Sequence, residues 1–176
     1  MKELTKKKGI ILTSKDYKEN ARLLTILTED GLENPILRGA NKNNSKNKKI
    51  TIIEVEYVRT ISTLATFTEG YITNNFINLK LDQNKSLIYL AIVEKILAFT
   101  DSIDDKSQMY EFVNKILTLL DQTKYPIVVL YLFEIKLLYL IGIAPILNSC
   151  VICHNSSDDC GFSLISRCLH IVITIT

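Results

Sequence analysis

The feature that most constrains this chain is the stretch 126–141, in which only Glu134 and Lys136 are charged. Pro126 suits the first turn of a helix, where its missing N–H would be unpaired anyway, and Gly142 suits the left-handed residue that stops one. A helix that is apolar on every side belongs in the middle of a packed domain or in a membrane. Its 16 residues rise roughly 24 Å, less than the roughly 30 Å hydrocarbon core of a bilayer. The sequence therefore predicts a buried central helix and no membrane span.

The helix is followed by four cysteines that are clustered within the last 27 residues: Cys150, Cys153, Cys160 and Cys168. Two thiolates two residues apart can share one tetrahedral zinc ion, which needs a second pair of ligands to close the site. Cys168 fits that pair, but Ile171 stands where its second cysteine would be, so Cys160 or His170 would supply the fourth ligand. We expect zinc, if bound, to use Cys150, Cys153 and Cys168 in an incomplete knuckle over 150–170; a half-site without metal is the alternative. Such clustering favours a reducing cytoplasm over a disulfide framework.

The first 75 residues contain five short strand-like runs, at 8–13, 22–28, 32–38, 50–60 and 64–72. Residues 14–20 are polar and turn-like, and Pro35 predicts an edge or a bulge in the third run. In the fourth run, Ile53, Val55, Tyr57 and Arg59 lie on one face. Five short strands without a helical period predict a small closed barrel, of which the OB-fold is the expected type and an SH3-like barrel the alternative.

From Asp82 the apolar period becomes helical. One predicted helix carries Leu87, Leu90, Ala91, Glu94, Leu97 and Ala98 at helical spacing, with Ile88, Ile92 and Ile96 beside them. A second carries Tyr110, Val113, Ile116, Leu117 and Leu120, and residues 100–105 between them supply capping side chains. The sequence therefore predicts an α+β protein, with a five-stranded OB-fold barrel over 1–78 and an α-helical domain with a cysteine knuckle over 79–176.

Positive charge is concentrated at the start of the chain. Residues 1–60 hold 13 Lys and Arg against 8 Asp and Glu, a net charge of +5, whereas the remainder is net −3. The candidate DNA-binding residues are the basic side chains of this part: Lys6, Lys7, Lys8, Arg22, Arg38, Lys42, Lys46, Lys48, Lys49 and Arg59. Lys and Arg neutralise phosphates without reading sequence. Solvated surface charge is the alternative interpretation, and for base stacking the candidates are only Tyr17, Tyr57, Phe67 and Tyr71, of which Tyr57 and Phe67 fit the core better.

The second half of the central helix and the residues that follow it resemble a known family. This stretch carries Phe133, Glu134, Leu137, Leu138, Gly142, Pro145, Leu147, Cys150 and Cys153, which is similar to the hallmark segment of the bacterial RecO recombination mediators. Residues 9–12, 16–19, 24–28, Gly31 and Gly39-Ala40 stand in the order in which that family has similar residues. The resemblance implies an OB-fold followed by a helical domain with a cysteine knuckle. It also implies a non-enzymatic, cytoplasmic, nucleoid-associated protein of RecF-type recombinational DNA repair, which anneals single strands and helps to load the recombinase.

The implied partners are single- and double-stranded DNA, RecR and the acidic C-terminal tail of the single-stranded DNA-binding protein. The chain departs from the family at two places. Many members have Arg directly before the Phe-Glu pair, where this chain has Leu132, so we expect weaker tail binding. After Cys168 the family continues with helices, whereas 169–176 is strand-like, and we interpret it as a truncated or frame-shifted end.

Two other classes of function compete with this interpretation. One is an OB-fold RNA-binding or transcription factor with a zinc knuckle. The other is an enzyme that uses Cys150 and Cys153 for redox chemistry, although no βαβ pattern surrounds them. The sequence contains no Gly-rich phosphate loop and no nucleophile elbow, so we predict that the chain is not an enzyme.

Overall fold

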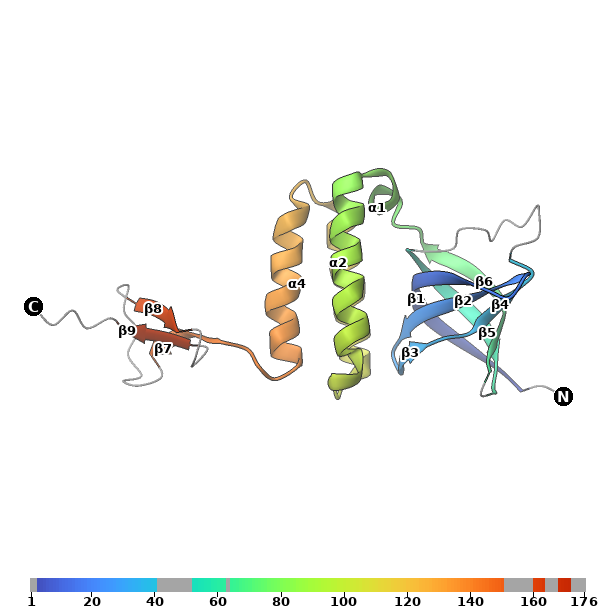
Figure 1. Ribbon diagram of the computed structural model, residues 1–176, viewed down its shortest axis with the longest axis horizontal. Helices are drawn as coiled ribbons and strands as arrows, with labels where there is room; N and C mark the ends of the chain where they lie inside the picture. The colour runs from blue at the N-terminus through green and yellow to red at the C-terminus, as the bar shows by residue number, and fades with distance from the viewer. Residues whose placement is uncertain (1–2, 41–51, 63, 151–159, 164–167, 172–176) are drawn as a thin grey trace, which may run out of the picture. The chain divides into compact units, whose positions relative to one another are not determined.

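The computed structural model describes residues 3–40, 52–62, 64–150, 160–163 and 168–171. Strands come first, helices follow, and three short strands come last (Figure 1). Two compact units are formed, Met1–Tyr131 and Leu132–Thr176. The domain boundary expected near residue 78 does not coincide with this division and stays a prediction.

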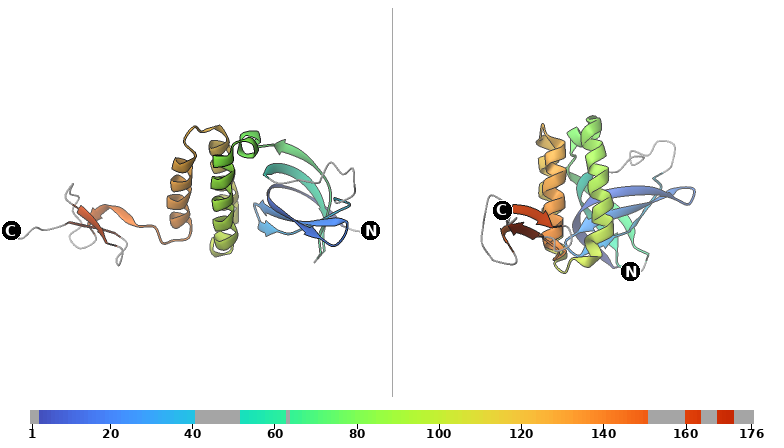
Figure 2. Two further views of the ribbon diagram at one scale, coloured as in Figure 1. Left: turned by 45° about the horizontal axis from the view of Figure 1, so that its top comes forward. Right: turned by 60° about the vertical axis from the view of Figure 1, so that its left-hand side comes forward.

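The first unit begins with a mixed sheet whose hydrogen bonding runs around a ring, an OB-like arrangement (Figures 1 and 2). Its strands are β1 (Leu4–Tyr17), β2 (Ala21–Thr28), β3 (Gly31–Glu33), β4 (Ile36–Arg38), β5 (Ile53–Thr60) and β6 (Thr66–Asn74). The order is β1-β5-β6-β4-β2-β3, and β1 also pairs with β2, which closes the ring. Among the pairings of this sheet that the structure describes, only β4–β6 is parallel.

The described strands refine two predictions. Asn34 and Pro35 separate β3 from β4, where the sequence predicted an edge or a bulge in one strand. Both pieces pair with β2, so that six strands fill five positions in the ring. The predicted turn over 14–20 is wrong for its first half, because β1 continues to Tyr17 and pairs there with Ala21. Ladder hydrogen bonds come from the backbone, so polar side chains can continue a strand when they face solvent.

The core of the sheet consists of inward-facing side chains from four of these strands and of Ala40: Ile11, Leu24, Ile26, Leu37, Ala40, Ile53, Val55 and Tyr57. The predicted face of β5 is thereby confirmed for Ile53, Val55 and Tyr57. The rings of Tyr57 and Phe67 stack with their centroids 5.3 Å apart. β1 passes β2 so closely that a Cβ at Gly9 would lie 2.6 Å from Cγ2 of Ile26, so this position requires glycine.

The helical part contains α1 (Ile77–Leu81), α2 (Gln83–Phe99), the 3₁₀ turn η1 (Thr100–Ser102), α3 (Lys106–Gln122) and α4 (Pro126–Leu140). Asp82 caps α2 by accepting from the N–H groups of Asn84 and Lys85, and Asp105 caps α3 through Gln108. The five apolar residues predicted to line the second helix are all buried in α3.

The face predicted for the first helix is wrong. Leu87, Leu90 and Leu97 of α2 are exposed, while Ile92 and Ile96 beside them are buried together with Tyr89 and Val93. Apolar side chains occur almost all around α2, so their spacing alone could not select the packed face.

The central helix is only partly buried. Along α4, Val129, Phe133 and Leu137 are buried at a spacing of four residues. The stripe Tyr131, Ile135 and Tyr139 is about half exposed, at 56%, 47% and 54%. The predicted end is confirmed, because α4 stops at Leu140 and Gly142 adopts a φ of 74°. A helix apolar all round is therefore buried along only one stripe.

In the cysteine segment, the described residues form three short strands: β7 (Ile146–Cys150), β8 (Cys160–Ser163) and β9 (Cys168–Ile171). β7 pairs with β9 in parallel, and β8 pairs with β9 in antiparallel fashion. Across the residues that the structure describes, no helix combines the length and apolar content that a bilayer crossing needs.

Candidate nucleic-acid interface

The structure places five of the ten predicted DNA-binding residues in ion pairs with carboxylates of the same sheet. These are Lys6, Lys7, Lys8, Arg22 and Arg59. A cation that already faces a carboxylate can bind a phosphate only by exchanging one anion for another. The net positive charge of residues 1–60 therefore overstates the charge that this sheet offers to DNA.

Lys6 and Lys8 lie on the outward face of β1, beside β5. The ammonium of Lys6 lies 2.7 Å from Glu56, with its side chain 64% exposed, and its hydrogen bond to Glu56 is the main reason that the pKa of Lys6 is raised. Lys6 also lies over the ring of Tyr71, 5.6 Å from its centroid, and Tyr71 donates to Glu56. Lys8 lies 2.9 Å from Glu54, whose side chain is only 7% exposed. The exposed pair of Lys6 with Glu56 contributes only about 0–1 kcal/mol to stability, so Lys6 can exchange its partner.

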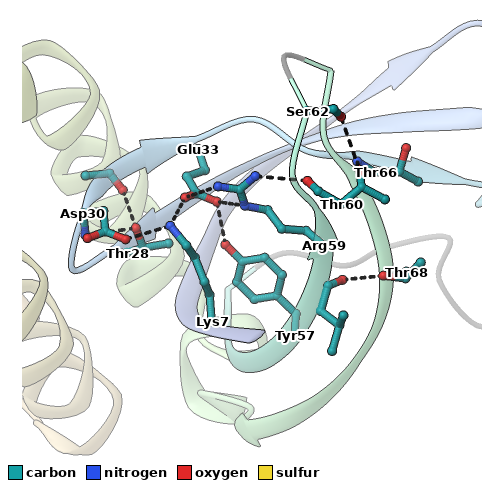
Figure 3. Close-up of polar contacts among 12 residues, drawn as sticks. Lys7, Thr28, Asp30, Glu33, Tyr57, Arg59, Thr60, Ser62, Thr66 and Thr68 are labelled. Atoms are coloured by element: carbon teal, nitrogen blue, oxygen red, sulfur yellow. Dashed lines mark hydrogen bonds and ion pairs between the residues drawn. The ribbon is translucent and has the colours of Figure 1, made fainter. Parts of the chain in front are cut away.

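Lys7 and Arg59 converge on one carboxylate, that of Glu33 on β3 (Figure 3). Arg59 approaches it at 2.7 Å through Nε and donates to it at 3.0 Å through Nη2, and the hydroxyl of Tyr57 donates at 3.0 Å. Lys7 donates to Glu33 and, at 2.7 Å, to the exposed Asp30. Both predicted cations are therefore neutralised in a half-buried cluster.

The remaining described candidate, Arg38, is exposed at the end of β4, beside the turn that joins β1 to β2. The N–H of Gly39 donates to the carbonyl of Asn20 at 2.6 Å and fixes this turn against the end of β4. A surface hollow of about 650 Å³ lies here, lined by Lys18, Glu19, Asn20, Ala21, Arg38 and Gly39. The nearby Arg22 is bound inward, 3.6 Å from Asp16 and donating to the carbonyl of Ser14.

Sequence reasoning missed Lys18, which lines the same hollow. Lys18 adopts a φ of 53° in the turn, and its ammonium lies 5.4 Å from the centroid of the Tyr17 ring. The pairing of β1 with β2 and of β2 with β4 places Tyr17, Ala21 and Arg38 in one row across three strands. The missed signal was the position of the turn, since a strand that stops at Thr13 leaves Lys18 far from Arg38.

Four predicted residues, Lys42, Lys46, Lys48 and Lys49, lie outside the residues that the structure describes. The described chain leads into their segment at Gly39 and Ala40, next to the hollow. Of the four stacking candidates, Tyr57 and Phe67 belong to the core, as expected, whereas Tyr17 is half-buried and Tyr71 is exposed.

The predicted zinc ligands fall only partly within the structure. The pairing of β7 with β9 places the backbone of Cys150 opposite Leu169, the residue after Cys168. Cys153 and the side chains of Cys150 and Cys168 lie outside the described part. Where side chains are described, no three His, Cys, Asp or Glu residues lie together as a metal site would require. Zinc binding stays a prediction.

Comparison with known proteins places these observations in one family. The family model described as "Recombination protein O N terminal" matches residues 1–76, and "Recombination protein O C terminal" matches residues 81–173.

Similar proteins are named "DNA repair protein RecO". Those of Bacillus subtilis, Listeria innocua and Oceanobacillus iheyensis are 27%, 23% and 30% identical to this chain over 91–92% of its length. The chain spans only 64–65% of the length of these relatives. The two matches run in the order of the OB-like ring and the helical part, and so this chain belongs to the RecO family of recombinational DNA repair proteins.

Proposed function

We propose that this chain is a non-enzymatic DNA-binding protein that binds and anneals single strands and helps to load the recombinase. The observation that carries this proposal is the match of both RecO family models, in order, to a chain that begins with an OB-like ring. In this proposal the ring is an OB-fold barrel, and the boundary between the two domains falls near residue 78, between the two matched ranges. The cytoplasm, close to the nucleoid, is the proposed location.

The proposed contact surface lies at the β1–β2 turn and the end of β4. Lys18 and Arg38 border the hollow there, and Tyr17 supplies an aromatic ring for one base. The lysines at 42, 46, 48 and 49 add charge directly after Ala40. Because this set combines several cations with one half-buried ring, electrostatic attraction outweighs stacking, and binding is independent of sequence.

The partners proposed for the chain are single- and double-stranded DNA, RecR and the tail of the single-stranded DNA-binding protein. Leu132, at the position expected to be Arg, is 49% exposed and so is accessible to such a tail. Cys150, Cys153 and Cys168 would hold a structural zinc ion, which would cross-link the segment that contains them.

The test uses the full chain with complementary oligonucleotides. Fluorescence anisotropy measures binding to single strands of different sequence, and a quenched fluorophore pair measures annealing. Acceleration of annealing, with affinity similar across sequences, is the expected result. Tight binding to RNA, or to one DNA sequence, without annealing would instead support the RNA-binding or transcription-factor alternative.

A further inference from the structure

The cluster around Glu33 differs from the other ion pairs of the sheet because its cations face the interior of the ring. Lys7 pairs in register with Tyr57 on β5. Residues two apart on a strand share a face, so Lys7 lies on the same side of β1 as Gly9 and the buried Ile11. The side chains of Lys7, Arg59 and Glu33 are 19%, 18% and 15% exposed, compared with 64% for Lys6.

The groups that hold the Glu33 carboxylate are the groups that bind a phosphate. One guanidinium, one ammonium and one phenol surround it (Figure 3). Arg presents two parallel N–H donors, which suit carboxylate and phosphate oxygens equally well. Burial is the main reason that the pKa of Tyr57 lies far above its ordinary value, so its hydroxyl remains a donor at any physiological pH.

Charge balance decides what a DNA strand gains here. Lys7 and Arg59 carry two positive charges, and Glu33 and Asp30 carry two negative ones. A phosphate that approaches this neutral cluster is not attracted until one carboxylate leaves. The side chain of Asp30 is 73% exposed and forms an ion pair with Lys7, whereas the carboxylate of Glu33 lies between Lys7 and Arg59.

Exchange at this position requires little movement of the chain. Glu33 is the last residue of β3, which in this structure is three residues long and pairs within the sheet only with β2. Asn34 and Pro35 separate it from β4. A rotation of the Glu33 side chain vacates the position without breaking the pairing of β3 with β2.

We propose that Lys7, Tyr57 and Arg59 form a binding site for a DNA phosphate, and that Glu33 is an internal competitor which occupies this site in the absence of DNA. This inference rests on the proposed DNA-binding function. It assigns Glu33 as a negative regulator of affinity: the carboxylate must be displaced before the two cations can contribute. The alternative is a purely structural cluster that closes one end of the ring.

The test compares Glu33→Gln with Glu69→Gln in the full chain. Glu69 is an exposed carboxylate on β6, so both variants remove one negative charge. Single-strand affinity is measured by anisotropy as a function of salt concentration. Glu33→Gln should raise the affinity roughly three- to tenfold at low salt and steepen the salt dependence by about 0.7, the value for one further phosphate contact with a single strand. Glu69→Gln should change both quantities little.

A triple variant, Glu33→Gln with Lys7→Gln and Arg59→Gln, should lose the gain. If Glu33→Gln does not fold, as judged by circular dichroism, Glu33→Asp replaces it; the shorter side chain keeps its charge but reaches the cations less well, so affinity should still rise. If the folded Glu33 variants bind single strands no more tightly than the wild-type chain does, the inference is overturned and the proposed function is left intact.

A second probe, inorganic tripolyphosphate, separates the two proposals. Calorimetry should show that tripolyphosphate binds Glu33→Gln more tightly than wild type. If it does so while no variant binds DNA, the phosphate site stands and the proposed function fails. If neither ligand distinguishes the variants, the cluster is structural only.

Discussion

The hydroxyl of Tyr110 on α3 donates a 3.0 Å hydrogen bond to Oε1 of Glu54 on β5. Asn114 donates to the same oxygen at 2.8 Å, and Thr73 of β6 donates to the other oxygen at 2.9 Å. Together with Lys8, these donors satisfy a carboxylate that is only 6% exposed. Glu54 therefore joins the ring of strands to α3 within the first unit.

Replacing Tyr110 by Phe removes one donor to this charged acceptor and keeps the ring. Because hydrogen bonds to charged groups are worth about 1.5–3 kcal/mol, the free energy of unfolding should fall by about 1.5 kcal/mol. Urea denaturation measures it. Tyr125→Phe is the matched control, since Tyr125 is 70% exposed, and it should be neutral. Equal effects in the two variants would contradict the role of Glu54.

Stability should fall in acid because of two carboxylates. Burial favours the neutral acid of Glu54, but the hydrogen bonds from Lys8, Thr73 and Tyr110 outweigh burial and lower its pKa below the ordinary 4.5. Burial likewise opposes ionisation of Glu33, and Lys7 and Arg59 outweigh it, so the pKa of Glu33 is also lowered.

A lowered pKa in the folded state means that, below 4.5, the unfolded chain binds more protons. The stabilisation is complete above the unfolded pKa and is lost as the pH falls through the folded pKa. Urea midpoints measured from pH 7 to pH 3 should therefore decrease, and the decrease should be smaller in Glu33→Gln. A midpoint independent of pH over this range would contradict the prediction.

The lysine-rich segment after Ala40 should supply phosphate contacts. Replacing Lys42, Lys46, Lys48 and Lys49 by Ala should weaken single-strand affinity equally across sequences. The salt dependence should become shallower by up to about 2.8, for four contacts. Replacing Lys80, Lys95 and Lys115 of the helices together with Lys124, between α3 and α4, removes the same charge and should have a smaller effect. An unchanged salt slope would remove the segment from the interface.

Restoring arginine before the Phe-Glu pair should strengthen binding of the acidic tail. Leu132→Arg adds a cation at an exposed position of α4 and should raise the affinity for a tail peptide about three- to tenfold, with a steeper salt dependence. Calorimetry with the peptide measures it, and Leu119→Arg on α3 is the control. If the wild-type chain already binds the tail peptide tightly and with a strong salt dependence, Leu132 does not weaken this interaction and the prediction is contradicted.

The exposed stripe of α4 should make the chain self-associate. Tyr131, Ile135 and Tyr139 follow one another at four-residue spacing, each about half exposed. Sedimentation velocity should show association that rises with concentration and that Ile135→Lys reduces, while Leu81→Lys, at a more exposed position on α1, does not. A wild-type chain that stays monomeric at all concentrations would contradict this expectation.

The sequence predicted best where one residue type determines the backbone. Pro126, Gly142 and the cap Asp105 bound their helices as expected. On α3 the apolar stripe is narrow enough to identify the packed face, whereas on α2 and α4 apolar residues surround the helix and the buried stripe depends on neighbours.

The candidate site was less predictable, because strand register decides which carboxylate, if any, pairs with a given cation. Lys6, Lys7 and Lys8 are consecutive and chemically identical, but each meets a different carboxylate. Lys6 and Lys8 pair with Glu56 and Glu54 of β5, whereas Lys7 pairs with Glu33 of β3. No local pattern reveals that Glu33 meets Arg59, which lies 26 residues away along the chain. Because the end of β1 is polar, the sequence did not predict that β1 reaches Tyr17, and so it did not predict that Lys18 lies near Arg38.

The closed ring also limits when the first unit can fold. Leu4 of β1 pairs with Thr60 of β5. In the sheet, β6 lies between β4 and β5, and it is complete only when the chain reaches Asn74. During synthesis β1 and β2 can form a hairpin early, and β3 and β4 add to the β2 edge. The edge of β1 stays open until β5 has left the ribosome, and the edge of β4 stays open until β6 has done so. Pairings this distant in sequence fold slowly, and open edges bind other strands. A nascent RecO chain is therefore most exposed to aggregation while its first 75 residues emerge, before any helix is available to cover them.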